Sequence, residues 1–155
     1  MTGGLHRRTL PRMIKNSISV DRPIEAVFDY AAQFEKHPEW QPDLKAATFS
    51  VTPAVGAVGT ETRKMGPQTH TYEWRVSEYT PPQRLSFETL SGPMRPSGTM
   101  IFSSEAADRT RVDFEMAMNP RGFMKVMAPF IERHVHKMNQ QHLQRFKQRL
   151  ENPSA

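Results

Sequence analysis

Two polar side chains fall among apolar neighbours, where they could contact a small molecule. Tyr72 belongs to the alternating run 70–79, and His142 lies in helical register with the apolar residues of a long C-terminal segment. A phenol or an imidazole on an apolar wall can give or take a proton, or can orient a ligand. A buried histidine is more often a satisfied core residue than a base, so both interpretations of His142 stay open.

The other histidines and the carboxylates form no familiar catalytic or metal-binding pattern. His134 and His136 are two residues apart and would point to different sides of a helix. His6, His37 and His70 have no acidic or histidine partner at ligand spacing. The chain has no Cys, no Walker-type phosphate loop and no nucleophile elbow. We therefore expect no metal site and no cofactor, and the catalytic residues, if any exist, remain unknown.

The segment 121–151 is expected to form the principal helix. Asn119 could cap its first turn, and Pro120 suits the first helical position because the missing N–H costs nothing there. A single long helix with one apolar face needs a sheet to pack against. That face is predicted from steps of three or four residues, or their sums, at Met127, Ile131, Val135, Met138, Phe146 and Leu150.

Most of the chain before residue 121 is predicted to form strands. The first strand has Asn16 as a polar interruption on its apolar face, and a helix opens near Asp21 and ends before Pro38. A short turn or second helix follows at 39–42. The last six strands are joined by short turns, so they should be antiparallel neighbours in an α+β fold. The predicted strands cover 13–20, 45–51, 60–65, 70–79, 84–90, 94–104 and 110–118.

The inward faces of these elements would form one apolar surface. It could be a fully packed core, which periodicity alone favours, or the wall of a ligand cavity. Trp40 would then be either a lid or a staple that holds the short helix to the sheet, and we favour the staple. The sheet would contribute Tyr72, Trp74, Leu85, Phe87, Met100, Phe102, Val112, Phe114, Met116 and Met118, and the helix Met127, Ile131, Val135 and Met138.

The net charge of +5 is distributed unevenly along the chain. Residues 121–151 carry +5, residues 1–15 carry +4 and the remaining middle carries −4. Because the predicted sheet is slightly acidic, we expect no nucleic-acid binding, and the basic helix face is most simply a solvated one. Docking of that face or of the N-terminal tail on an acidic partner or RNA is the alternative.

Compartment and membrane association can also be predicted from composition. No apolar run approaches the roughly 20 residues of a membrane span, so we expect no integral membrane association. The first ten residues lack the apolar stretch of a signal peptide. The absence of Cys fits a reducing cytoplasm. We therefore expect a cytoplasmic protein, either a monomer or a homodimer.

Several segments, in this order, resemble the START-like (SRPBCC) superfamily, in its polyketide cyclase/dehydrase and lipid-transport-like branch. They are 18–30, 37–42, 56–60, 76–85 and 143–151. The resemblance implies a helix-grip fold, in which a seven-stranded antiparallel sheet curves around a long C-terminal helix. Two short helices would lie between the first and second strands. A single domain, 12–152, would follow a flexible basic tail at 1–11.

Because of this resemblance, we favour a cavity between sheet and helix over a fully packed core. It implies binding of a hydrophobic or amphipathic small molecule, such as a lipid, an aromatic or a polyketide-like compound. The alternative is a cyclase/dehydrase-type enzyme that uses Tyr72 or His142 for proton transfer. The candidate ligand-binding residues are Tyr72, Trp74, Phe87, Met100, Phe102, Phe114, Met116, Met127, Ile131, Val135, Met138 and His142.

Overall fold

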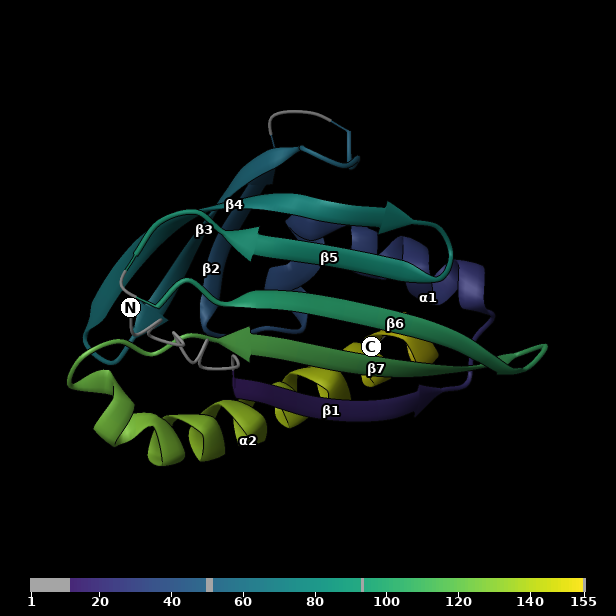
Figure 1. Cartoon of the computed structure of the whole chain (residues 1–155). Helices are drawn as coiled ribbons and strands as arrows, with labels where there is room; N and C mark the ends of the chain where they lie inside the picture. The colour runs from purple at the N-terminus through teal and green to yellow at the C-terminus, as the bar shows by residue number, and fades with distance from the viewer. Residues whose placement is uncertain (1–11, 50–51, 93, 155) are drawn as a thin grey trace, which may run out of the picture.

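The computed structural model describes residues 12–49, 52–92 and 94–154, and the predicted tail at 1–11 lies outside them. Seven strands and three helices follow one another along this part of the chain (Figure 1). The strands are β1 (Arg12–Val20), β2 (Leu44–Phe49), β3 (Val58–Met65), β4 (Gln68–Thr80), β5 (Arg84–Thr89), β6 (Ser97–Ala106) and β7 (Arg109–Met118). The helices are α1 (Ile24–Ala32), the short 3-10 helix η1 (Phe34–Glu39) and α2 (Met124–Glu151).

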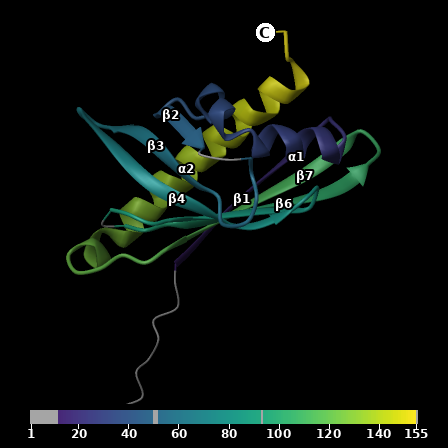
Figure 2. The same ribbon diagram turned by 90° about the horizontal axis from the view of Figure 1, so that it is seen from above.

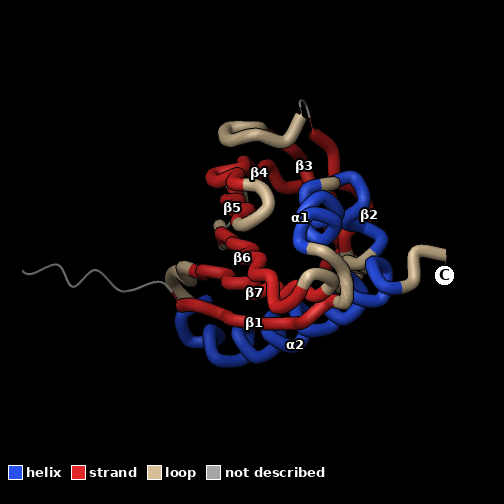
Figure 3. Tube along the Cα trace, turned by 90° about the vertical axis from the view of Figure 1, so that its right-hand side faces the viewer, coloured by secondary structure: helices blue, strands red, loops and turns tan. Residues whose placement is uncertain are grey.

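The strands form one antiparallel sheet in the order β1-β7-β6-β5-β4-β3-β2. The sheet curls around the helices, with α2 along β1 (Figure 3). Figure 2 shows α2 crossing the fold diagonally on the side that also holds α1. The predicted helix-grip fold is confirmed. No helix of the described residues is long and apolar enough to cross a bilayer.

Helix α1 closes one end of the concave face of the sheet with a dense aromatic and aliphatic core. Phe28 is fully buried and packs edge-on against Phe102 of β6 and Tyr79 of β4, at ring-centroid distances of 5.3 and 5.5 Å. Val27 and Ala31 lie buried in the same core. The predicted first helix is therefore correct in type but shorter than expected, because η1 begins at Phe34.

The polar residue in the first strand has a structural role. Asn16 is buried on β1, and its Nδ2 donates to the Gln140 side chain and to the backbone carbonyl of His136, both at 3.0 Å. Closer to the start of both elements, Arg12 pairs with Glu132 at 3.0 Å. These contacts hold α2 along the edge strand, where it also covers an edge that could otherwise pair with another chain.

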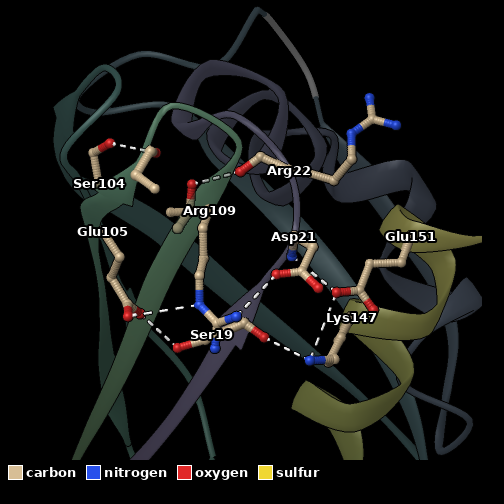
Figure 4. Close-up of polar contacts among 10 residues, drawn as sticks. Ser19, Asp21, Arg22, Ser104, Glu105, Arg109, Lys147 and Glu151 are labelled. Atoms are coloured by element: carbon tan, nitrogen blue, oxygen red, sulfur yellow. Dashed lines mark hydrogen bonds and ion pairs between the residues drawn. The ribbon is translucent and has the colours of Figure 1, made fainter.

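The same arrangement continues to the end of the helix (Figure 4). Lys147 donates to the carbonyl of Ser19 at 2.9 Å, and the Glu151 carboxylate accepts from the backbone N–H of Asp21 at 2.8 Å. Asp21 also accepts from Arg109, the first residue of β7. Polar contacts therefore run along α2 from its third turn to its last.

The two halves of α2 differ sharply in packing. Leu143, Phe146 and Leu150 are buried against the core, whereas Phe130 is 67% exposed. The helix also starts later than predicted. Gly122 has a φ of +59°, which lies outside the helical region, so the chain cannot form a continuous helix back to Asn119.

We predict that Phe146→Ala destabilises the protein by about 3–5 kcal/mol, since it empties a fully buried site beside Tyr30 and Trp40. Phe130→Ala, the same change on the same helix at an exposed site, should cost less than about 0.5 kcal/mol. Urea unfolding of both variants measures the difference. Equal losses in the two variants would contradict the described packing of α2.

We also predict that His37 makes the protein sensitive to acid. Burial lowers the pKa of His37 to about 4, against the opposing effect of the hydrogen bond that its Nε2 makes with the carbonyl of Ala31 at 2.7 Å. The unfolded chain, with a pKa of 6.5, binds the proton first, so stability is full above pH 6.5 and is lost as pH falls towards 4.

His37→Gln keeps a donor for the Ala31 carbonyl but cannot titrate. Relative to this variant, the wild type should lose roughly 3 kcal/mol of unfolding free energy between neutral pH and pH 4. The measurement is chemical unfolding of both proteins across that pH range. Parallel profiles would show that His37 does not cause the loss.

Candidate functional site

A cavity of about 380 Å³ lies between the sheet, η1 and the middle of α2. The sheet contributes side chains from β3 to β7, and α2 contributes Val135, Met138 and His142. From η1 and the residue after it come Phe34, His37 and Trp40. The volume is within the range of small-molecule sites and would hold one molecule of moderate size.

The apolar wall of the cavity depends on one glycine of β6. A Cβ atom on Gly98 would lie 2.7 Å from the ring of Phe87 and 3.0 Å from that of Phe114. The absence of that atom lets the two rings, from β5 and β7, stack at a centroid distance of 6.3 Å over β6. Met100 of the same strand continues this wall, so aromatic and thioether groups face the ligand space.

Trp40 and Phe34 separate the cavity from the core beneath α1. Trp40 is buried and packs edge-on against Phe146 of α2, with ring centroids 5.1 Å apart. Phe34 packs against Trp74 of β4 at 4.7 Å. Trp40 is therefore a staple, as favoured, but it fixes η1 to α2, and Phe34 makes the contact with the sheet.

One end of the cavity carries a charged cluster. Arg63 of β3 donates to Asp43 at 2.7 Å, to Glu61 at 3.1 Å and to Gln41 at 2.7 Å. The Nε2 of His142 lies 2.8 Å from the other oxygen of Asp43. All five residues line the cavity. Among the described residues, no three acidic or histidine side chains are placed to hold a metal ion.

Asp43 and Arg63 of the cluster are held in their charged forms. Burial alone would raise the pKa of Asp43, but the contact with His142 and the guanidinium of Arg63 keep that pKa well below its usual range. Burial likewise opposes the charge on Arg63, and Glu61 and Asp43 outweigh it, so its pKa is raised. Two carboxylates facing one guanidinium leave no unbalanced positive charge at this end of the cavity.

The structure brings most of the candidate ligand-binding residues together. Tyr72 lies near the rim, with its hydroxyl 3.1 Å from the sulfur of Met65. The candidates that line the cavity are Tyr72, Trp74, Phe87, Met100, Phe114, Met116, Val135, Met138 and His142. Contact between these side chains and a ligand remains a prediction.

Three candidates do not line the cavity. Phe102 points to the same side of β6 as Met100, but it lies at the end of the strand that α1 covers, where Phe28 packs on it. Met127 is 38% exposed and Ile131 lines only a minor pocket beside Arg12, because the first turns of α2 extend past the end of β7 (Figure 1).

Of the charged cluster, sequence reasoning identified only His142 and missed Gln41, Asp43, Glu61 and Arg63. Glu61 and Arg63 are two residues apart on a strand and so share a face. Charged residues on a strand normally indicate the face exposed to solvent. That rule would assign Glu61 and Arg63 to the outer face, whereas both line the cavity. Asp43 precedes β2 in a short connection and carries no local signal at all. Only the tertiary arrangement places it against His142.

Solved structures with a similar fold are known. The protein TTHA0849 of Thermus thermophilus has a TM-score of 0.79 at 14% identity, with 93% of this chain and 100% of that chain covered. A START superfamily protein of Mycobacterium smegmatis has a TM-score of 0.77 at 12% identity, with 92% and 99% covered. The ZhuI aromatase/cyclase of Streptomyces sp. R1128 has a TM-score of 0.72 at 13% identity, with 93% and 98% covered. At these identities the likeness shows the shared fold.

Sequence comparison identifies the family. No protein of curated function matches the chain. A family model described as polyketide cyclase / dehydrase and lipid transport matches residues 12–151, which include every strand and helix of the structure. The order of strands, the clasped C-terminal helix and the cavity beneath it agree with that match. The chain therefore belongs to the polyketide cyclase/dehydrase and lipid transport family.

Proposed function

We propose that the protein binds one hydrophobic or amphipathic small molecule in the cavity beneath α2. The observation that carries the proposal is the cavity itself, about 380 Å³ in volume, with aromatic and methionine walls and polar groups gathered at one end. Methionine side chains adapt to the shape of a ligand, and aromatic rings bind flat apolar groups. Family membership supports the same function.

The charged cluster restricts the polar part of the ligand. Arg63 is already neutralised by Asp43 and Glu61, so a ligand carboxylate or phosphate would have to displace one of them. A neutral hydroxyl or carbonyl group could hydrogen-bond to the cluster without breaking an ion pair. The ligand we expect is thus an oxygenated apolar molecule, such as a lipid alcohol, an aromatic or a polyketide-like compound.

A second candidate function is catalysis of the cyclase or dehydrase type. The contact between His142 and Asp43 favours it, since a carboxylate on one ring nitrogen orients the imidazole and stabilises its protonated form. With Nε2–H directed to Asp43, the Nδ1 atom is the ring nitrogen left to accept a proton. Enclosure by apolar walls would protect a reactive chain from water. A cytoplasmic location suits either function.

We predict that Val135→Trp blocks ligand binding, because the indole would fill part of the cavity from the α2 side. The affinity for 1-naphthol, an oxygenated aromatic probe measured by its fluorescence, should fall at least about tenfold. Gln141→Trp adds the same ring to an exposed site of the same helix and should leave affinity unchanged. Equal affinities in both variants would exclude the cavity as the binding site.

If the protein is an enzyme, His142→Gln should separate turnover from binding. Native mass spectrometry of gently purified protein can first identify a bound ligand, and turnover of that compound or its precursor can then be assayed. We expect turnover to fall at least about 100-fold, while the affinity for ligand changes only a few-fold. Tyr72→Phe is the parallel variant. Full turnover in both variants would show that neither His142 nor Tyr72 transfers a proton in the reaction.

A further inference from the structure

The first two turns of α2 and the residue just before them present apolar side chains to solvent. Phe123 is 75% exposed, Val126 70%, Met127 38% and Phe130 67%. The spacing of these residues places them on one side of the helix, opposite the side that carries Ala128. We call these four residues the outer stripe. Nothing in the described part of the chain covers it.

Exposed basic side chains lie near the outer stripe. Arg133 and Lys137 continue the side of α2 that carries the stripe, and both are exposed. Arg121 and Lys125 are also exposed near its start, but Lys125 points to the other side of the helix and Arg121 precedes it. Over residues 121–137 the one acidic residue is Glu132, and it is already paired with Arg12 at 3.0 Å. The stripe is therefore an apolar patch that two exposed cations continue on the same side of the helix, and residues 121–137 hold no unpaired acid.

We propose that the outer stripe docks on an anionic lipid surface, with its apolar side chains inserted at the headgroup level. A helix with apolar residues on one side and lysines or arginines beside them is typical of interfacial membrane binding. Each basic side chain near an anionic leaflet adds electrostatic attraction. This would be a peripheral contact, since no helix of the described residues can span a bilayer.

Shape and charge favour a membrane over a protein partner. The stripe lies on a convex helix end that extends past the end of β7 (Figure 1), and a bilayer accepts such a ridge without a matching groove. A second copy of the chain, meeting this surface with the same surface, would bring the Arg133 and Lys137 charges of both copies together, four like charges in all. Their repulsion therefore disfavours self-association through the stripe.

The stripe also lies beside the ligand cavity. Phe123 is exposed, and the next residue, Met124, lines the cavity. A protein docked through the stripe would hold the rim of its cavity against the lipid phase. A hydrophobic ligand could then pass between membrane and cavity with little exposure to water. This last step rests on the proposed function, whereas membrane docking does not.

The test is flotation of the full chain with vesicles of phosphatidylcholine alone and with vesicles containing about one third phosphatidylglycerol. We expect binding only to the anionic vesicles, with loss of binding in about 0.5 M NaCl. Phe123→Ser combined with Phe130→Ser should reduce binding at least about tenfold. Arg133→Gln combined with Lys137→Gln should also reduce it about tenfold.

Val55→Ser is the matched control, since Val55 is 66% exposed in the loop before β3. It should bind vesicles like the wild type, and so should Val135→Trp, which blocks the cavity and leaves the stripe intact. Thermal unfolding checks that each variant is folded. If the wild type binds vesicles but does not bind 1-naphthol, that result would count against the proposed function and would leave the docking proposal standing.

Three results would overturn the docking proposal. One is an absence of binding to the anionic vesicles, and another is binding that the Phe123→Ser and Phe130→Ser changes leave unaltered. The third is a dimer, measured by light scattering, that dissociates when those two changes are made. In that case the stripe is an interface with a second copy of the chain.

Discussion

The position of α2 along the edge strand is the constraint on which the rest of the structure depends. Asn16 in the middle of β1 and Lys147 near the end of the helix fix that position through hydrogen bonds to backbone and side chains. A helix held along one edge cannot fill the concave face of the sheet. The space that remains between helix and sheet is the cavity, and its size follows from where the helix is attached.

The two ends of the concave face are used differently because α1 and η1 cover only one of them. Under α1, Phe28 fills the space between the helix and β6 and leaves a solid core. Beyond η1, Trp40 and Phe34 form a partition, and the strands past it carry flat rings and flexible methionines with no helix pressed on them. One sheet thereby supports both stability and ligand binding. The stabilising contacts need not change when a ligand enters.

The charged cluster makes one end of the cavity polar, while the rest of its wall is apolar. Asp43, Arg63 and His142 come from a connecting loop, a strand and α2, so the cluster also joins three parts of the fold. Its charges are largely balanced internally, which limits the cost of placing them against an apolar space. A ligand would contact apolar side chains on one side and hydrogen-bonding groups on the other. This difference in polarity would set the orientation of the ligand in the cavity.

The sequence by itself determined the elements and their order. Alternation in the strands, helical spacing from Val135 to Leu150 and short turns between strands are local properties, and they predict an antiparallel sheet with one long helix. They also identify most of the apolar wall, because residues such as Trp74 and Phe87 alternate with polar neighbours. Gly122 set the start of α2 later than the capping signal at Asn119 predicted, since a positive φ interrupts the helix.

Only the tertiary structure decided which apolar residues face empty space. Phe102 and Met100 have the same local pattern on β6, and they differ only in whether α1 lies above them. Ile131 and Val135 likewise share one face of α2, and they differ in whether the sheet extends beneath them. Asp43 and His142 are distant in the chain, so their pairing has no local signal. Local sequence encodes the periodicity of each helix and strand. The boundaries of the cavity depend instead on where one packed helix or strand ends over another, which is a property of the tertiary structure.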